Sequence, residues 1–240
     1  MKIFPAIDLR GGNVVRLLQG DYSKETIYSS NPLSVAAEFE EAGCEYLHVV
    51  DLDGAIGGTQ PNFLAVKEII ENTGLKVEIG GGIRNEQIIV DYASIGALRV
   101  IIGTMAVKDP EFTARMIRKH GSNVAVGIDI VGIKAAISGW TEVSDRTVDE
   151  MIESLIDDGC DTIICTDISR DGAMKGTNME LYRKLVKSYG GYIDIVASGG
   201  ISTMDELRKL RDIGVDAAII GKALYSGALD IRDIVAEFAE

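Results

Sequence analysis

Short runs of β-branched and other apolar residues alternate along the chain with longer segments whose apolar residues recur at helical spacing. The short runs are typical of buried strands, and the longer segments of helices with one buried face. Eight strands are predicted, at Lys2–Ile7, Tyr46–Val50, Lys76–Ile79, Arg99–Ile102, Asn123–Ile128, Thr162–Cys165, Tyr192–Ala197 and Ala217–Ile220. Eight helices are predicted between and after them, at Leu33–Ala42, Phe63–Asn72, Glu86–Ile95, Pro110–His120, Val148–Asp158, Glu180–Tyr189, Met204–Ile213 and Ile231–Phe238.

Glycine follows most of the predicted helices, where a left-handed residue is favoured just after the last turn. These glycines are Gly43, Gly74, Gly96, Gly121, Gly159, Gly190 and Gly214. Strict alternation of strand and helix indicates parallel strands joined by crossover helices. Both a closed barrel and an open, doubly wound sheet fit this alternation.

An internal repeat decides between the two. The motif Asp-Gly-Ala-x-x-Gly-Thr at 53–59 recurs at 171–177, and the same offset of 118 residues carries Gly81-Gly82-Ile83 onto Gly199-Gly200-Ile201. Two copies of a four-strand unit nearly exhaust 240 residues. We therefore predict a single (β/α)8 TIM barrel over 1–240, built from half-barrel repeats at about 1–121 and 122–240.

Two connections are longer than the others. Gly11–Ser30 follows the first strand, and Val131–Arg146 follows the fifth. Within the second, the segment Ile133–Ser138 is expected to form a small hairpin or lid. Long connections after the strands of a barrel are where functional mobility concentrates.

The C-terminal ends of the strands carry glycine in two matched pairs, after strands 3 and 4 and after strands 7 and 8. Glycine lets backbone N–H groups approach an anion closely, and a phosphate site between strands 7 and 8 recurs in barrels. Two such cradles on opposite sides of the mouth suit a ligand phosphorylated at both ends; tight turns are the structural alternative. The expected binding residues are Gly80, Gly81, Gly82, Arg84, Gly103, Thr104, Trp140, Gly176, Thr177, Ser198, Gly199, Gly200, Gly221 and Lys222.

Asp8 and Asp129 end strands 1 and 5, which lie opposite one another in an eight-strand barrel. A carboxyl group on each side of a bound sugar supplies one general base and one general acid, provided that their environments separate their pKa values. A helix cap or loop tether is the alternative role for such an aspartate. Thr166, at the end of strand 6, is expected to orient a carboxylate or bind a ribose hydroxyl. Asp8, Asp129 and Thr166 are the expected catalytic residues.

Other polar residues receive structural interpretations. Asp51 and Asp167 occupy matched positions and are expected to brace the loops that follow them. A guanidinium in a loop can pair with phosphate, but Arg16, Arg84 and Arg170, each taken alone, fit surface charges. His48 fits a neutral, hydrogen-bonded interior residue, and His120 fits a helix C-terminus. Trp140 either stacks on a flat heterocycle or anchors its loop.

Composition restricts the partners. A net charge of −13 repels nucleic acid and anionic lipid, so neither is an expected partner. Three cysteines without CxxC spacing and two histidines suggest no disulfide framework and no metal site. No apolar stretch is long enough for a membrane span, and no signal peptide is recognised at the N-terminus. A cytoplasmic monomer without a cofactor is expected.

Six segments together resemble the ProFAR isomerase family of histidine biosynthesis, the phosphoribosylformimino-5-aminoimidazole carboxamide ribotide isomerases. They are Pro5–Leu9, His48–Ala55, Glu78–Arg84, Gly139-Trp140, Thr166–Gly172 and Ala197–Ile201. The resemblance covers nearly the whole chain and touches the end of nearly every strand.

The resemblance implies a duplicated half-barrel that rearranges an aminoaldose to an aminoketose, an Amadori reaction, on a substrate with two ribose phosphates. It implies that Asp129 protonates the ring oxygen and that Asp8 takes the C2 proton. It places Thr166 near the reacting sugar and Trp140 against the ligand, with no metal or organic cofactor. The loops after strands 1, 5 and 6 are expected to close over the ligand.

Three alternatives stay open from the sequence. The first is the sister barrel, the cyclase subunit of imidazole glycerol phosphate synthase, although its usual cysteine-containing first strand is replaced here by Pro5–Asp8. The second is a dual-substrate isomerase that also accepts phosphoribosylanthranilate. The third is a barrel that binds a phosphorylated metabolite without catalysis.

Overall fold

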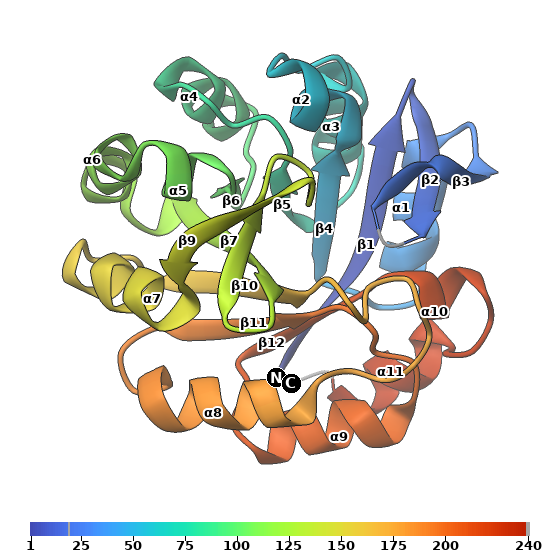
Figure 1. Cartoon of the computed structure of the whole chain (residues 1–240). Helices are drawn as coiled ribbons and strands as arrows, with labels where there is room; N and C mark the ends of the chain where they lie inside the picture. The colour runs from blue at the N-terminus through green and yellow to red at the C-terminus, as the bar shows by residue number, and fades with distance from the viewer. Residues whose placement is uncertain (19, 239–240) are drawn as a thin grey trace.

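The computed structural model describes residues 1–18 and 20–238 and has a closed barrel of eight parallel strands at its centre (Figure 1). In order around the barrel, the strands are β1 (Lys2–Arg10), β4 (Tyr46–Asp51), β5 (Lys76–Gly80), β6 (Arg99–Ile102), β7 (Val124–Val131), β10 (Thr162–Asp167), β11 (Asp194–Ser198) and β12 (Ala217–Ile220). Pairing of β12 with β1 and of β7 with β10 closes the ring. The predicted (β/α)8 barrel is confirmed, and the doubly wound sheet is excluded.

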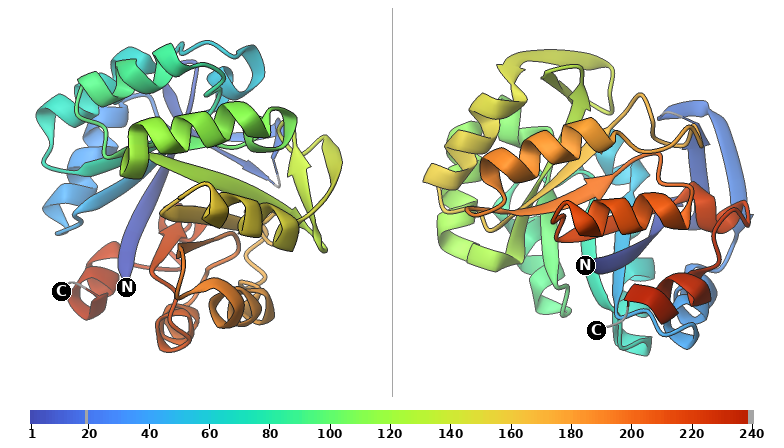
Figure 2. Two further views of the ribbon diagram at one scale, coloured as in Figure 1. Left: turned by 90° about the vertical axis from the view of Figure 1, so that its left-hand side faces the viewer. Right: turned by 90° about the horizontal axis from the view of Figure 1, so that it is seen from below.

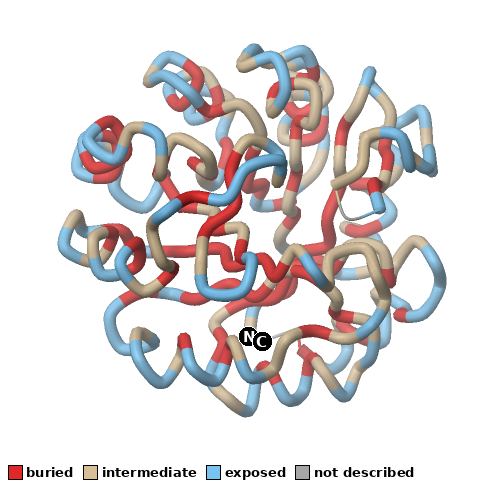
Figure 3. The backbone as a smooth tube through the Cα atoms, viewed as in Figure 1, coloured by how far each residue is buried: buried red, intermediate tan, exposed pale blue. Residues whose placement is uncertain are grey.

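Helices cover the outside of the barrel (Figure 2). They are α1 (Pro32–Glu41), α3 (Phe63–Asn72), α4 (Glu86–Ser94), α6 (Pro110–His120), α7 (Val148–Asp157), α8 (Met179–Tyr189), α9 (Met204–Asp212) and α11 (Ile231–Phe238). Buried backbone follows the strands and the inner faces of the helices (Figure 3). A large apolar core fills the space between strands and helices, and a smaller cluster that includes Phe4, Ile101 and Ile164 fills the barrel interior.

The predicted elements are confirmed to within three residues at their ends. The left-handed conformation expected of the glycines after the helices is wrong for two of them. Gly43, Gly96, Gly159 and Gly214 have the expected positive φ. Gly190 instead has φ −62°, because it continues the right-handed turn that ends α8. Gly74 is likewise outside the left-handed region, since α3 ends in an extended residue at Thr73.

Two β-ribbons rise from the C-terminal end of the barrel. The segment interpreted as a plain connection forms β2 (Asn13–Leu18) and β3 (Asp21–Ser29), and β2 pairs with the end of β1. The expected hairpin after strand 5 is confirmed as β8 (Lys134–Ile137) and β9 (Glu142–Thr147), and β8 pairs with the end of β7. Both ribbons therefore begin on strands that carry a candidate catalytic aspartate.

Four short helical segments complete the described chain. Three lie at the C-terminal ends of strands: α2 (Leu52–Gly57) after β4, α5 (Met105–Lys108) after β6 and α10 (Lys222–Tyr225) after β12. The fourth, η1 (Gly121–Asn123), leads from α6 into β7. The three short α-helices begin at the face of the barrel where the candidate site lies.

Candidate active site

Asp8 and Asp129 lie on β1 and β7, which stand opposite one another in the ring of eight strands. Neither residue ends its strand as the sequence suggested. Each is two residues before the end, because the strand continues into its ribbon, where Asp8 pairs with Val15 and Asp129 with Ala136. Both carboxyl groups therefore lie at the point where a barrel strand leaves the barrel.

Asp8 is ion-paired with Arg16 of β2. The Nη1 of Arg16 donates to Oδ2 of Asp8 at 2.7 Å, and its Nη2 donates to the carbonyl of Ala6 at 2.5 Å. The guanidinium also lies over the ring of Tyr225, 5.1 Å from its centroid. The interpretation of Arg16 as a surface charge is therefore wrong; β2 carries it inward against the first strand, and its side chain is only 12% exposed.

Asp129 has a different environment. Burial raises the pKa of Asp129 to about 6, although hydrogen bonds from Trp140 and Thr166 and the charge of His48 act to lower it. Thr166 stands beside Asp129 in register on β10. Trp140 comes from the turn between β8 and β9 and has a positive φ of 70°. The structure thus brings Asp129, Thr166 and Trp140 together, and it places the indole N–H on a candidate catalytic carboxyl group.

A third carboxyl group, Asp171, lies in the connection after β10 and was given no chemical role from the sequence. Burial raises the pKa of Asp171, Arg16 lowers it and Asp8 raises it further. Asp171 therefore interacts electrostatically with the pair formed by Asp8 and Arg16. Two sequence signals pointed to it: the repeated motif, in which Asp171 corresponds to Asp53, and the segment Thr166–Gly172 of the family resemblance.

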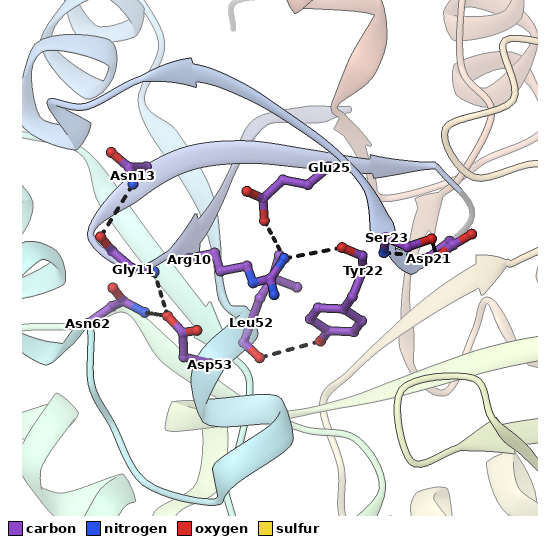
Figure 4. Close-up of polar contacts among 10 residues, drawn as sticks. All are labelled: Arg10, Gly11, Asn13, Asp21, Tyr22, Ser23, Glu25, Leu52, Asp53 and Asn62. Atoms are coloured by element: carbon purple, nitrogen blue, oxygen red, sulfur yellow. Dashed lines mark hydrogen bonds and ion pairs between the residues drawn. The ribbon is translucent and has the colours of Figure 1, made fainter.

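Asp53 has a bracing role instead. Its Oδ2 accepts from the backbone N–H of Gly11 at 2.7 Å and from Asn62 at 2.9 Å, which ties α2 to the turn between β1 and β2 (Figure 4). In the same region, Arg10 pairs with Glu25 across the ribbon (Figure 4).

Asp51 and Asp167 brace their loops in matched ways. Asn62 donates to Asp51 at 2.7 Å, and Asn178 donates to Asp167 at the same distance. Asp51 also caps α2 by accepting from the backbone of Gly54. The predicted bracing role of both aspartates is confirmed.

Close backbone packing accounts for four of the glycines expected to bind phosphate. A Cβ on Gly81 would lie 2.1 Å from the carbonyl oxygen of Asp51, and one on Gly82 would lie 2.2 Å from that of Gly54. Gly199 and Gly200 approach the carbonyls of Asp167 and Gly176 in the same way. All four also have positive φ. Their lack of a side chain is thus required by the fold, with or without a bound anion.

Gly103 and Gly221 are different. A Cβ on Gly103 would meet no atom within 4 Å, and one on Gly221 would meet only the Arg16 guanidinium at its closest contacts. Each stands at the start of a short helix, α5 or α10. The neighbouring side chains hold the loops: Thr104 accepts from the backbone of Ser138 at 3.1 Å, and Lys222 donates to the carbonyl of Gly172 at 2.8 Å.

The remaining candidates already have partners within the protein. The backbone N–H of Thr177 donates to Glu206 at 2.8 Å, and the same carboxylate lies against Gly176. The backbone of Ser198 is bonded to the hydroxyl of Tyr182. Arg84 is exposed and donates to the carbonyls of Ala55 and Ile56. Gly80 ends β5, with Ile101 beside it.

Neither a metal site nor a membrane-spanning helix is found in the part of the chain that the structure describes. Over residues 1–18 and 20–238, no group of three or more His, Cys, Asp and Glu side chains is arranged to hold a metal ion. Within the same part of the chain, none of the helices combines the length and apolar character needed to cross a membrane.

A (β/α)8 barrel with carboxyl groups gathered at the C-terminal ends of its strands has the arrangement of the barrel enzymes. More particularly, the chain belongs to the family described as histidine biosynthesis protein, whose model matches residues 2–230. Three curated relatives share the name 1-(5-phosphoribosyl)-5-((5-phosphoribosylamino)methylideneamino) imidazole-4-carboxamide isomerase. The one from Brachyspira hyodysenteriae is 46% identical over 98% of both chains. Those from Clostridium acetobutylicum and Sulfurovum sp. are both 42% identical, over 98% and 97% of both chains respectively.

Proposed function

We propose that this chain is an intramolecular aldose–ketose isomerase of histidine biosynthesis, which converts the bisphosphorylated aminoaldose to its phosphoribulosyl form by an Amadori rearrangement. The observation that carries the proposal is the difference between two opposed carboxyl groups. Asp8 is ion-paired with Arg16, whereas burial raises the pKa of Asp129 to about 6. One base and one acid are what the reaction requires.

The proposed steps use these two groups in turn. Asp129 donates its proton to the furanose ring oxygen, the bond from that oxygen to C1 breaks, and a protonated Schiff base forms. Asp8 then takes the proton from C2, and the electron pair moves to give an enolamine that tautomerises to the ketose. Thr166 and Trp140 hold the Asp129 carboxyl group in place through the hydrogen bonds described above.

The two phosphates are proposed to bind beside Gly103 and Gly221, which directly follow β6 and β12, two strands that stand opposite one another in the ring. The unfilled space at Gly103 and the location of both glycines before short helices support this arrangement. Soaking a crystal with inorganic phosphate tests it: density at both sites is expected, and density at one alone would contradict a two-phosphate mouth.

Conversion of the aminoaldose by the purified protein, followed spectroscopically, tests the function. Asp8→Asn and Asp129→Asn are each expected to lower kcat by about 10²–10⁴-fold while ligand affinity stays within about threefold. Asp205→Asn, on the exposed first turn of α9, is the matched control and is expected to leave kcat unchanged. If the wild-type protein binds the aminoaldose but does not convert it, the isomerase function is wrong and the chain is a barrel that binds a phosphorylated metabolite without catalysis.

The same assay with phosphoribosylanthranilate separates a dual-substrate isomerase from one restricted to the histidine pathway, and production of an imidazole ring from the ketose and ammonia would indicate the sister cyclase.

We further propose that the protein works as a cytoplasmic monomer on a small molecule and binds no nucleic acid. Sedimentation of the purified protein with and without ligand tests the oligomeric state.

A further inference from the structure

The turn that joins β8 to β9 has a strained backbone. Ser138, Gly139 and Trp140 follow one another with φ of 57°, 64° and 70°, all in the left-handed region. Glycine adopts this region freely, whereas a serine and a tryptophan do so at a cost and stay there only where the surrounding structure holds them. The turn therefore depends on support from its neighbours.

Ser138 is the residue through which the turn is held. Its backbone N–H donates to Oγ1 of Thr104 at 3.1 Å, and its hydroxyl accepts from Nζ of Lys108 at 2.9 Å. Its carbonyl accepts from the hydroxyl of Thr141 at 2.8 Å, within the turn itself. Thr104 directly precedes α5, and Lys108 is the last residue of that helix. Two of the three hydrogen bonds of Ser138 therefore attach the turn to the connection after β6.

Lys108 contacts both ends of this turn. Besides the hydroxyl of Ser138, its Nζ lies 3.8 Å from Oε2 of Glu142, the first residue of β9. Ile137 and Glu142 pair in register, so Lys108 lies at the point where the hairpin closes. The side chain of Lys108 is 47% exposed, and its replacement therefore opens no cavity in the core.

Trp140 is the side chain that this turn carries to the candidate active site. Its half-buried indole is hydrogen-bonded to the Asp129 carboxyl group. The same ring lies against Gly20 in the turn of the first ribbon, where an added Cβ would come within 2.5 Å of it. A two-stranded ribbon is only marginally stable by itself. The location of the indole therefore depends on what holds the turn, and Ser138 lies two residues away.

We propose that Lys108 and Ser138 are positioning residues of the isomerase: their hydrogen bond attaches the turn between β8 and β9 to α5, and this fixes the indole of Trp140 on the Asp129 carboxyl group. The proposal rests on the function proposed above, in which Asp129 is the acid. The substrate then meets an acid that is already oriented, which is where a rigid supporting contact contributes to catalysis. Both residues act through Trp140 and not on the substrate.

Lys108→Met removes the donor to Ser138. The maximal kcat of the pH profile is expected to fall by about two- to fivefold, the effect of one partly exposed hydrogen bond. Lys108→Arg keeps a charged donor and is expected to restore most of this loss. Lys134→Met is the matched control, because Lys134 pairs with Asp145 at 3.5 Å on the same ribbon and begins β8, at the end away from the turn. An unchanged kcat in Lys108→Met, or an equal loss in Lys134→Met, would overturn the proposal.

A double-mutant cycle with Trp140→Phe separates positioning from general support of the fold. If Lys108 acts through the indole N–H, adding Lys108→Met to Trp140→Phe should change kcat by less than about twofold. Ser138→Gly removes the other partner of the hydrogen bond and is tested in the same cycle. Glycine keeps the left-handed φ at no cost, so this variant loses only the hydroxyl. Losses that multiply in the double variants would contradict an action through Trp140.

Fluorescence gives a readout that needs no turnover, since Trp140 is the only tryptophan. Acrylamide is expected to quench the indole more readily in Lys108→Met and in Ser138→Gly than in the wild-type protein, and equally in Lys134→Met. Quenching that is unaltered in both of the first two variants would overturn the proposal. If quenching changed as expected but the wild-type protein did not convert the aminoaldose, the isomerase function would fail while the placement of Trp140 by Lys108 and Ser138 stood.

Discussion

Asp53 and Asp171 occupy the same position in the repeated motif, 118 residues apart, and the structure gives them different surroundings. Asp53 is tied to the backbone of Gly11 and to Asn62, so it braces the first ribbon. Asp171, in the connection after β10, interacts electrostatically with Asp8 and Arg16, and burial raises its pKa. The same residue therefore supports the scaffold in one half of the barrel and contributes charge to the candidate site in the other.

Replacement of Arg16 by methionine is expected to lower kcat/KM by about 10–100-fold, because the Asp8 carboxylate loses the charged partner that orients it. Arg10→Met is the matched control on the same ribbon. Arg10 pairs with Glu25 instead of a candidate catalytic group, so kcat/KM is expected to stay within about threefold. Equal losses in the two variants would show that the ribbon as a whole, and not the contact with Asp8, is responsible.

Trp140→Phe and Thr166→Val each remove a hydrogen bond that lowers the pKa of Asp129. That pKa should therefore rise above about 6 in both variants. Since the acid acts in its protonated form, the alkaline limb of the kcat profile is expected to move to higher pH, most in the double variant. A shift to lower pH in either variant would mean that Asp129 is not the group that titrates.

Asp129→Asn is expected to make the protein more stable near pH 8 while it removes turnover. Burial raises the pKa of Asp129 from 3.8 to about 6, so the folded state binds more protons than the unfolded chain between these values. The free energy of unfolding of the wild-type protein thus falls as the pH rises through that window. Asparagine avoids this loss, and because the site is partly open to solvent, we expect a gain of about 1–2 kcal/mol at pH 8 that disappears below about pH 4.

Urea unfolding of the wild-type protein and of Asp129→Asn, at pH 8 and below about pH 4, measures this difference in the free energy of unfolding. Asp8→Asn is the contrasting variant, because it leaves the largely buried Arg16 without its partner and is expected to destabilise the protein at pH 8. A loss of stability in Asp129→Asn at pH 8 would contradict a raised pKa at that position.

Gly20→Ala tests the contact between the two ribbons. Gly20 has φ +72°, and a Cβ there would lie 2.5 Å from the ring of Trp140. The added methyl group is expected to displace the indole, and because Trp140 is the only tryptophan, its fluorescence should shift toward the red. Gly12→Ala has nearly the same φ, +78°, but open space around its Cβ, so it imposes the backbone strain without the clash. The same shift in both variants would exclude the contact as its cause.

Much of the site was recognisable in the sequence because barrel enzymes place their functional groups at strand ends. The spacing of the strands located Asp8, Asp129 and Thr166 on one face, and the repeat indicated that β1 and β7 stand opposite one another. The glycines after strands 3 and 7 were less informative. Tight backbone packing and an anion cradle both require glycine, so the sequence pattern alone could not separate the two.

The sequence by itself determined the eight-fold alternation of strand and helix, since short buried runs and amphipathic segments are local properties of the chain. It also determined the matched positions of the aspartates, because these follow from the repeat. Only the tertiary structure decided that Arg16 turns inward onto Asp8, that Asp171 interacts with this pair while Asp53 braces a ribbon, and that Lys108 reaches Ser138. These relationships depend on contacts between residues distant in the sequence and on the removal of charge from water, and neither is encoded in local spacing.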